Sequence, residues 1–74
     1  MARDKRPPGG VRVTFGARVR QERKAANMTL EDLAERADMN WSYIAQVERG
    51  ERNIGIDNMM AIAEGLGIPL RDLL

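Results

Sequence analysis

The sequence contains no cysteine and no histidine among its 74 residues. Without cysteine the chain cannot form the disulfides of small secreted domains, and without either residue it lacks the usual ligands of structural zinc. A chain of this length buries only about 60% of the surface that its unfolded form exposes. Self-association is therefore the remaining common way for so small a domain to gain stability.

Long apolar runs are also missing. No stretch reaches the roughly 18 residues that a membrane-spanning helix needs, and no apolar stretch follows the basic N-terminus, so we expect no signal peptide. The absence of cysteine is typical of reducing compartments. We therefore expect a cytoplasmic protein with no membrane partner, no cofactor and no small-molecule substrate.

The net charge is only +1, but it is unevenly distributed. Residues 1–12 carry +3, whereas residues 13–74 carry −2. The first segment also contains two prolines, two glycines and little apolar surface, so it cannot bury enough area to offset the entropy of ordering. We expect residues 1–12 to be a flexible basic arm and residues 13–74 to form one domain.

Apolar residues recur at helical spacing along the domain. The first stripe is Phe15, Val19, Glu22 and Ala26, with Thr14 as a suitable N-cap. No stretch of useful length alternates with period two, so the patterns predict an all-α protein, a compact bundle of four to five short helices. The later stripes are Leu30, Leu33, Ala34 and Ala37; Tyr43, Ile44 and Val47; and Ile56, Met59, Met60, Ile62, Ala63 and Leu66.

Start and stop signals separate these stripes. Thr29 and Asp32 have the spacing of a capping box, and Asn40 is a good N-cap for the third helix. Glycine favours the left-handed residue that ends many helices, and proline suits a helix start. The residues expected to mark the later boundaries are Gly50, Gly65 or Gly67, and Pro69.

Only Asp38, Met39 and Asn40 separate the second and third helices. So short a link makes the two helices cross steeply, which is the geometry of a helix-turn-helix. Ala34 is small enough to let them approach closely. Aspartate tolerates a left-handed conformation better than most residues, so Asp38 is compatible with this turn at the cost of some strain.

The segments TLEDLAERADMNWSYIAQVERGERN and MMAIAEGLGIPLRDLL resemble the phage repressor and Cro-type helix-turn-helix regulators, and the resemblance covers about residues 14–74. Within that family, SYIAQVERGERNIGIDNMMAIAEGLGI is most similar to the short controller proteins of restriction-modification systems. The resemblance implies a lambda-repressor-like fold whose third helix is a recognition helix in the major groove of double-stranded DNA.

We expect base contacts from the side of the third helix that faces away from the core. Gln46 offers the donor and acceptor that adenine recognition requires, Ala45 suits a thymine methyl, and Ser42 can bond to base or phosphate. Trp41 stands where relatives commonly have a polar or basic residue. The alternatives to a base contact there are stacking on a sugar, a hydrogen bond to phosphate, and packing on a partner protein.

Contacts to the DNA backbone are implied around this helix. Arg3, Lys5 and Arg6 of the arm add phosphate or minor-groove contacts, or else belong to a solvated tail. The resemblance also implies a partly buried ion pair between Arg23 and Glu48. The remaining candidate phosphate contacts are Thr29, Asn40, Arg49, Arg52 and Asn53.

The sequence therefore predicts a transcriptional regulator that binds a near-palindromic operator as a homodimer, with half-sites about one helical turn apart. We expect no enzyme, because the acidic cluster of Glu31, Asp32 and Glu35 has no histidine or cysteine beside it. The alternative is a helix-turn-helix interaction module, such as an antitoxin, that binds a partner protein. The expected dimer interface is a C-terminal apolar cluster of Ile68, Leu70, Leu73 and Leu74.

Overall fold

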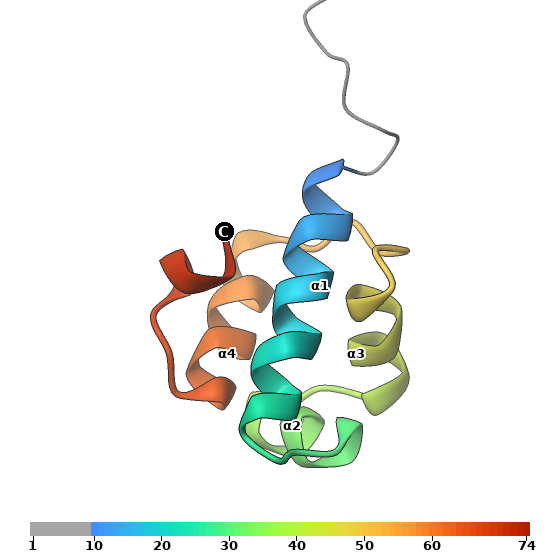
Figure 1. The fold of residues 1–74 in the computed structure, drawn as a ribbon. Coiled ribbons are helices and arrows are strands. Elements are labelled where there is room, and N and C mark those ends of the chain that lie inside the picture. Colours follow the sequence, from blue (N-terminus) through green and yellow to red (C-terminus); the bar gives the residue numbers. More distant parts are fainter. Residues whose placement is uncertain (1–9) are drawn as a thin grey trace, which may run out of the picture.

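A computed structural model describes residues 10–74 of the chain. Its elements are α1 (Gly10–Ala25), α2 (Leu30–Ala37), α3 (Trp41–Glu48), α4 (Ile56–Leu66) and a 3-10 helix, η1 (Leu70–Leu73). In Figure 1, α1 runs through the middle, α3 and α4 lie on either side of it, and α2 lies at its lower end. No strand occurs among residues 10–74, and none of their helices could cross a membrane. The predicted all-α bundle is confirmed.

One apolar core brings together side chains from every element. Burying one large apolar side chain contributes about 1.5–3 kcal/mol. This matters most for α2 and α3, which have eight residues each and are too short to be stable alone. The largest fully buried side chains are Phe15, Leu33, Ile44, Ile62, Leu73, Val19 and Val47.

The first helix begins earlier than predicted. Thr14, the expected N-cap, lies inside α1 and is exposed, and residues 10–12, expected in the arm, are helical. A tertiary contact accompanies this earlier start: a methyl group added to Gly50 would lie only 2.8 Å from Cγ2 of Val13, so the start of α1 packs on the turn that follows α3. Arg3, Lys5 and Arg6 lie outside the described residues.

The buried side of α1 also differs from the predicted stripe. Ala26 lies beyond the helix and is exposed, and Glu22 is only partly buried. Gly16 and Arg23 are buried instead, because both face α3. Hydrophobic periodicity missed these two positions, since neither is an apolar side chain.

The predicted caps of α2 and α3 are confirmed. The amide of Asp32 donates to Thr29 Oγ1 at 3.0 Å, and the amide of Thr29 donates to Asp32 Oδ2 at 2.9 Å. Because these bonds with Thr29 favour the charged carboxylate, the pKa of Asp32 lies below its ordinary value. Asn40 caps α3, since its Oδ1 accepts from the amide of Ser42 at 2.8 Å and from Ser42 Oγ at 2.6 Å.

The fourth helix ends at Gly67, which has φ +74°, and Pro69 is the N-cap of η1. Gly65 lies inside α4, where an added methyl group would stand 3.1 Å from Leu33. The predicted stripe was wrong at two positions of this helix: Ile56 and Met60 are exposed, whereas Met59 packs against the core from the first turn.

Leu73 corrects the predicted dimer interface. Its side chain is completely buried in the core of the single chain, where η1 packs on α1 and α4. It has no surface left for a partner. Ile68 and Leu70 are partly buried against the same core, whereas Leu74 is 59% exposed.

Candidate nucleic-acid interface

The turn between α2 and α3 has the expected length and conformation. Asp38 is left-handed, with φ 58° and ψ 50°, and the amide of Met39 donates to the carbonyl of Ala34 at 2.8 Å. This pair of features is a Schellman ending, which satisfies carbonyls that the helix end would otherwise leave open. It turns the chain sharply into Asn40, so α3 starts at a fixed angle to α2.

The inner face of α3 is fixed by the core and by α1. Ile44 and Val47 are buried. On the other side of this contact, a methyl group added to Gly16 would lie 2.1 Å from the Val47 carbonyl oxygen and 2.8 Å from that of Glu48. The backbones of α1 and α3 are therefore in direct contact, and only glycine fits at this crossing.

A buried ion pair reinforces the same crossing. Arg23 Nε donates to Glu48 Oε2 at 2.6 Å, and Arg23 Nη2 donates to Glu48 Oε1 at 3.1 Å. The side chains are only 10% and 6% exposed. Hydrogen bonds to Glu48 raise the pKa of the Arg23 guanidinium further. The ion pair that the family resemblance implies is thus present.

Arg23 also reaches the segment between α1 and α2. Its Nη1 donates to the Met28 carbonyl at 2.8 Å, and its own carbonyl accepts from the Met28 amide at 3.0 Å. One guanidinium therefore joins α1, α3 and the residues that lead into α2. This connection sets the position of α3 relative to the start of α2.

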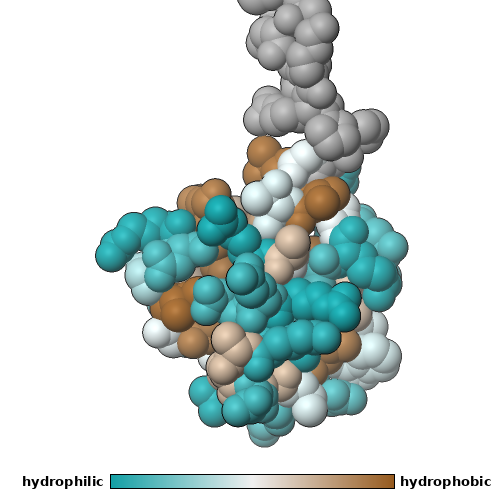
Figure 2. Space-filling view, viewed as in Figure 1, coloured by the Kyte–Doolittle hydropathy of each residue, from teal (hydrophilic) through white to brown (hydrophobic). Residues whose placement is uncertain are grey.

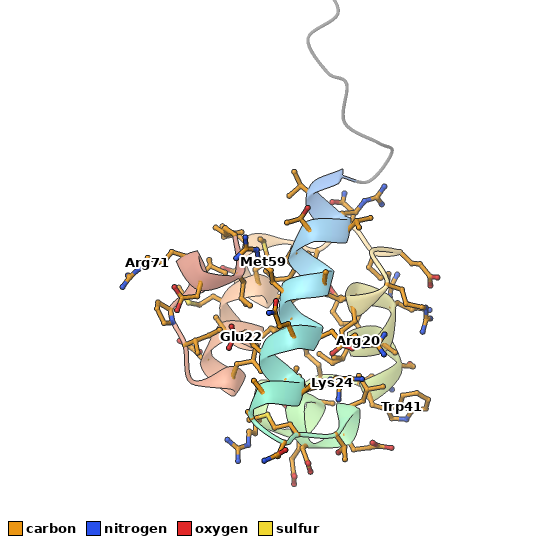
Figure 3. The ribbon with its side chains drawn as sticks, viewed as in Figure 1. Arg20, Glu22, Lys24, Trp41, Met59 and Arg71 are labelled. Carbon is orange, nitrogen blue, oxygen red and sulfur yellow. The ribbon has the colours of Figure 1, made fainter. Side chains whose placement is uncertain are left out.

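The outer face of α3 carries the four residues predicted to contact bases. Ser42 is exposed, Ala45 and Gln46 are partly buried, and Trp41 is 52% exposed. Figure 3 shows the Trp41 indole at the start of α3, pointing away from the bundle. The structure thus places these residues on the first turns of one short, firmly anchored helix.

Two arginines follow α3 in an exposed loop. Arg49 Nε lies 3.1 Å from Glu51 Oε2, and hydrogen bonding to Glu51 raises the pKa of Arg49. The Arg52 guanidinium lies 5.0 Å from the centre of the Tyr43 ring, a cation–π arrangement. Asn53, also in this loop, is exposed.

Tyr43 links this loop to α4. Its hydroxyl accepts a hydrogen bond from Asn58 Nδ2 at 3.2 Å, while its ring supports Arg52. The sequence predicted Tyr43 only as part of the apolar face of α3. Its supporting role for Arg52 was missed, because a residue pair nine apart across a loop has no periodic signal.

The start of α2 lies on the other side of the turn. The capping box occupies the Thr29 oxygen as an acceptor, so the hydroxyl hydrogen of Thr29 remains available as a donor. Nearby, Glu31 and Glu35 are exposed. Among residues 10–74 no three side chains of the metal-ligating types come together as a metal site.

Comparison with known proteins identifies relatives of this chain. The family model described as Helix-turn-helix (HTH_3) matches residues 19–73. The chain is 43% identical over 65 residues to the control protein C.BamHI of Bacillus amyloliquefaciens, covering 86% of this chain and 80% of that protein. It is 31% identical over 64 residues to the control protein C.MunI of a Mycoplasma species, covering 85% and 86%.

A solved structure resembles the whole bundle. The restriction-modification controller protein C.AhdI from Aeromonas hydrophila superposes with a TM-score of 0.83 at 38% sequence identity. The match covers 85% of this chain and 96% of that one. The sequence similarity therefore covers at least 80% of each of these three relatives, and the similarity in backbone covers nearly all of C.AhdI.

Proposed function

The chain belongs to the helix-turn-helix family, and on that premise we propose that it is a sequence-specific DNA-binding transcriptional regulator. It binds an operator in double-stranded DNA and changes transcription by occupying it. Its activity is binding without catalysis, and its place is the cytoplasm, where bacterial operators lie. The resemblance to C.BamHI and C.AhdI favours the controller proteins of restriction-modification systems over other regulators of the family.

The observation that carries this proposal is the division of α3 into two faces. Ile44, Val47 and Glu48 hold the helix from inside. The opposite side presents exposed Ser42 and partly buried Ala45 and Gln46, none of which belongs to the apolar core. A rigid helix with a free polar face is what major-groove recognition requires, because base edges are distinguished by the placement of donors and acceptors.

The sequence of the operator can be found by selection from random duplexes, followed by footprinting. With the selected duplex in hand, Gln46→Ala is expected to reduce discrimination between the operator and its single-base variants by about 1–3 kcal/mol at one position. Arg52→Ala is expected to weaken binding to all duplexes alike, because phosphate contacts carry no sequence information. Competition binding measures both. Identical effects of the two variants would refute the division into recognising and positioning residues.

Dimerisation is part of the proposal. Leu74 is exposed beside a hollow of about 340 Å³ that the start of α1 lines with Val11 and Val13, both of them exposed apolar residues. Figure 2 shows hydrophobic surface near the first turn of α1. A second copy would cover this surface together with Ile68 and Leu70.

Sedimentation at tens of micromolar is therefore expected to give a dimer, and Leu74→Glu is expected to shift it towards monomer by placing a charge in the interface. The affinity of this variant for the operator should also fall, because a monomer cannot bind the two half-sites as one unit. Met60→Glu, which places the same charge at an exposed apolar residue of α4, is the matched control. A monomeric wild type, with and without operator, would contradict the dimer.

The half-exposed Trp41 favours one other function, a module that binds a partner protein through Trp41 and the acidic start of α2. The dependence of binding affinity on salt concentration distinguishes the two functions. A DNA complex with several phosphate contacts loses affinity steeply as salt rises. A flat salt response, or no binding to any selected duplex, would favour the protein partner.

A further inference from the structure

Two cations on α1 have no role in the interface described so far. Arg20 and Lys24 are exposed and lie four residues apart, on the same face of the helix. Figure 3 shows both side chains extending from α1 towards α3 and Trp41, while Glu22 points to the opposite side, towards α4. Arg20 and Lys24 thus lie on the flank of α1 nearest α3, and Glu22 lies on the opposite flank.

This flank is held close to α3. Gly16 brings the two backbones into contact at one end of the crossing, and Arg23 binds Glu48 between the positions of Arg20 and Lys24. Because Glu48 is already bound to Arg23, its carboxylate does not neutralise the two outer cations. Both cations therefore lie beside α3 on a helix whose position relative to α3 is fixed by the Gly16 contact and the Arg23–Glu48 ion pair.

Neither cation has an acidic partner among the residues that the structure describes. Among residues 10–74 the ion pairs are those of Arg23 with Glu48 and of Arg49 with Glu51, and neither includes Arg20 or Lys24. Lys24 lies in the last turn of α1, where a cation stabilises the helix dipole. That effect is confined to the last turn, so it does not account for Arg20.

We propose that Arg20 and Lys24 bind the sugar-phosphate backbone of DNA beside the recognition helix, so that the contact surface continues from α3 across Trp41 onto α1. This inference rests on the proposed function. The duplex that α3 enters must pass its backbone along one flank of that helix. On the α1 side it then meets an indole, which suits a sugar, followed by two cations, which suit phosphates.

The experiment compares two double variants of the full chain on the selected operator. Arg20→Gln with Lys24→Gln removes the proposed contacts. Arg12→Gln with Arg18→Gln removes the same charge from exposed positions nearer the start of the same helix. Affinity is measured from 50 to 300 mM salt, using the emission of Trp41, the single tryptophan of the chain. Thermal melting verifies that both variants fold.

The variant without Arg20 and Lys24 is expected to lose affinity about tenfold at low salt for all duplexes alike. The magnitude of the slope of log affinity against log salt should fall by about 1.8, since each of the two phosphate contacts contributes about 0.9. The control variant should keep the wild-type slope. Equal slopes in both variants, or a loss confined to one base position, would overturn the contact while leaving the proposed function intact. A wild type that binds no selected duplex would overturn both.

Discussion

Replacing Gly16 with alanine is expected to lower the free energy of unfolding by about 3 kcal/mol, at the upper end of the usual cost of overpacking. The added methyl group would lie 2.1 Å from the Val47 carbonyl oxygen, and the obstacle is backbone, so no side chain can rotate away. A domain of this size has a total stability of about 4–11 kcal/mol. Thermal melting should therefore show a drop of roughly 12–24 °C.

Helix propensity alone predicts the opposite sign. Alanine is favoured over glycine inside a helix by about 1 kcal/mol, so Gly16→Ala would stabilise α1 if its neighbourhood were open. Ala17→Gly, at the next and exposed position, measures that intrinsic term on the same helix and should cost about 1 kcal/mol. A Gly16→Ala protein as stable as the wild type would show that α1 and α3 do not meet there.

Glu48→Ala is expected to cost about 3–5 kcal/mol, because it leaves the Arg23 guanidinium buried without its partner. The loss comes from the stranded charge rather than from the net strength of the pair. Chemical denaturation measures it. The exposed pair of Arg49 and Glu51 gives the matched comparison, and Glu51→Ala should cost less than about 1 kcal/mol.

The double variant Arg23→Met with Glu48→Leu distinguishes the cost of the stranded charge from the net strength of the ion pair. It removes both charges and fills the space with apolar atoms, a replacement that is often neutral or stabilising. We expect it to recover most of the stability that Glu48→Ala loses. A double variant as unstable as Glu48→Ala would mean that the specific hydrogen bonds, including the one from Arg23 to the Met28 carbonyl, hold the crossing.

Local signals in the sequence predicted the fold well where local chemistry decides it. The capping box of Thr29 and Asp32, the Asn40 cap and the left-handed Asp38 depend on residues within a few positions of each other. The start of α1 depends on Val13 meeting Gly50, far along the chain. Leu73 was likewise misassigned, because an apolar residue near a terminus has the same pattern whether a partner or its own core covers it.

The candidate site was predictable to the same degree. Periodicity separated Ile44 and Val47 from the outer face of α3, and the family resemblance supplied the pairing of Arg23 with Glu48. Gly16 was missed because a glycine within a helical pattern indicates weak propensity and gives no sign of which backbone approaches it. The sequence pattern did not single out Arg20 and Lys24 for a similar reason: their proposed role depends on α3, the helix beside which they lie.

The Asn40 cap determines which hydrogen-bonding groups remain at the start of α3. The Ser42 hydroxyl gives its only hydrogen to Asn40 Oδ1, so towards solvent it has lone pairs alone. Asn40 keeps both hydrogens of its amide nitrogen. Phosphate oxygens are acceptors without hydrogens, so they complement Asn40 and not Ser42. Ser42 complements amino groups, which in the major groove belong to adenine and cytosine. Asn40 thus presents hydrogen-bond donors at the surface and Ser42 presents acceptors. The short hydrogen bond between their side chains determines this difference.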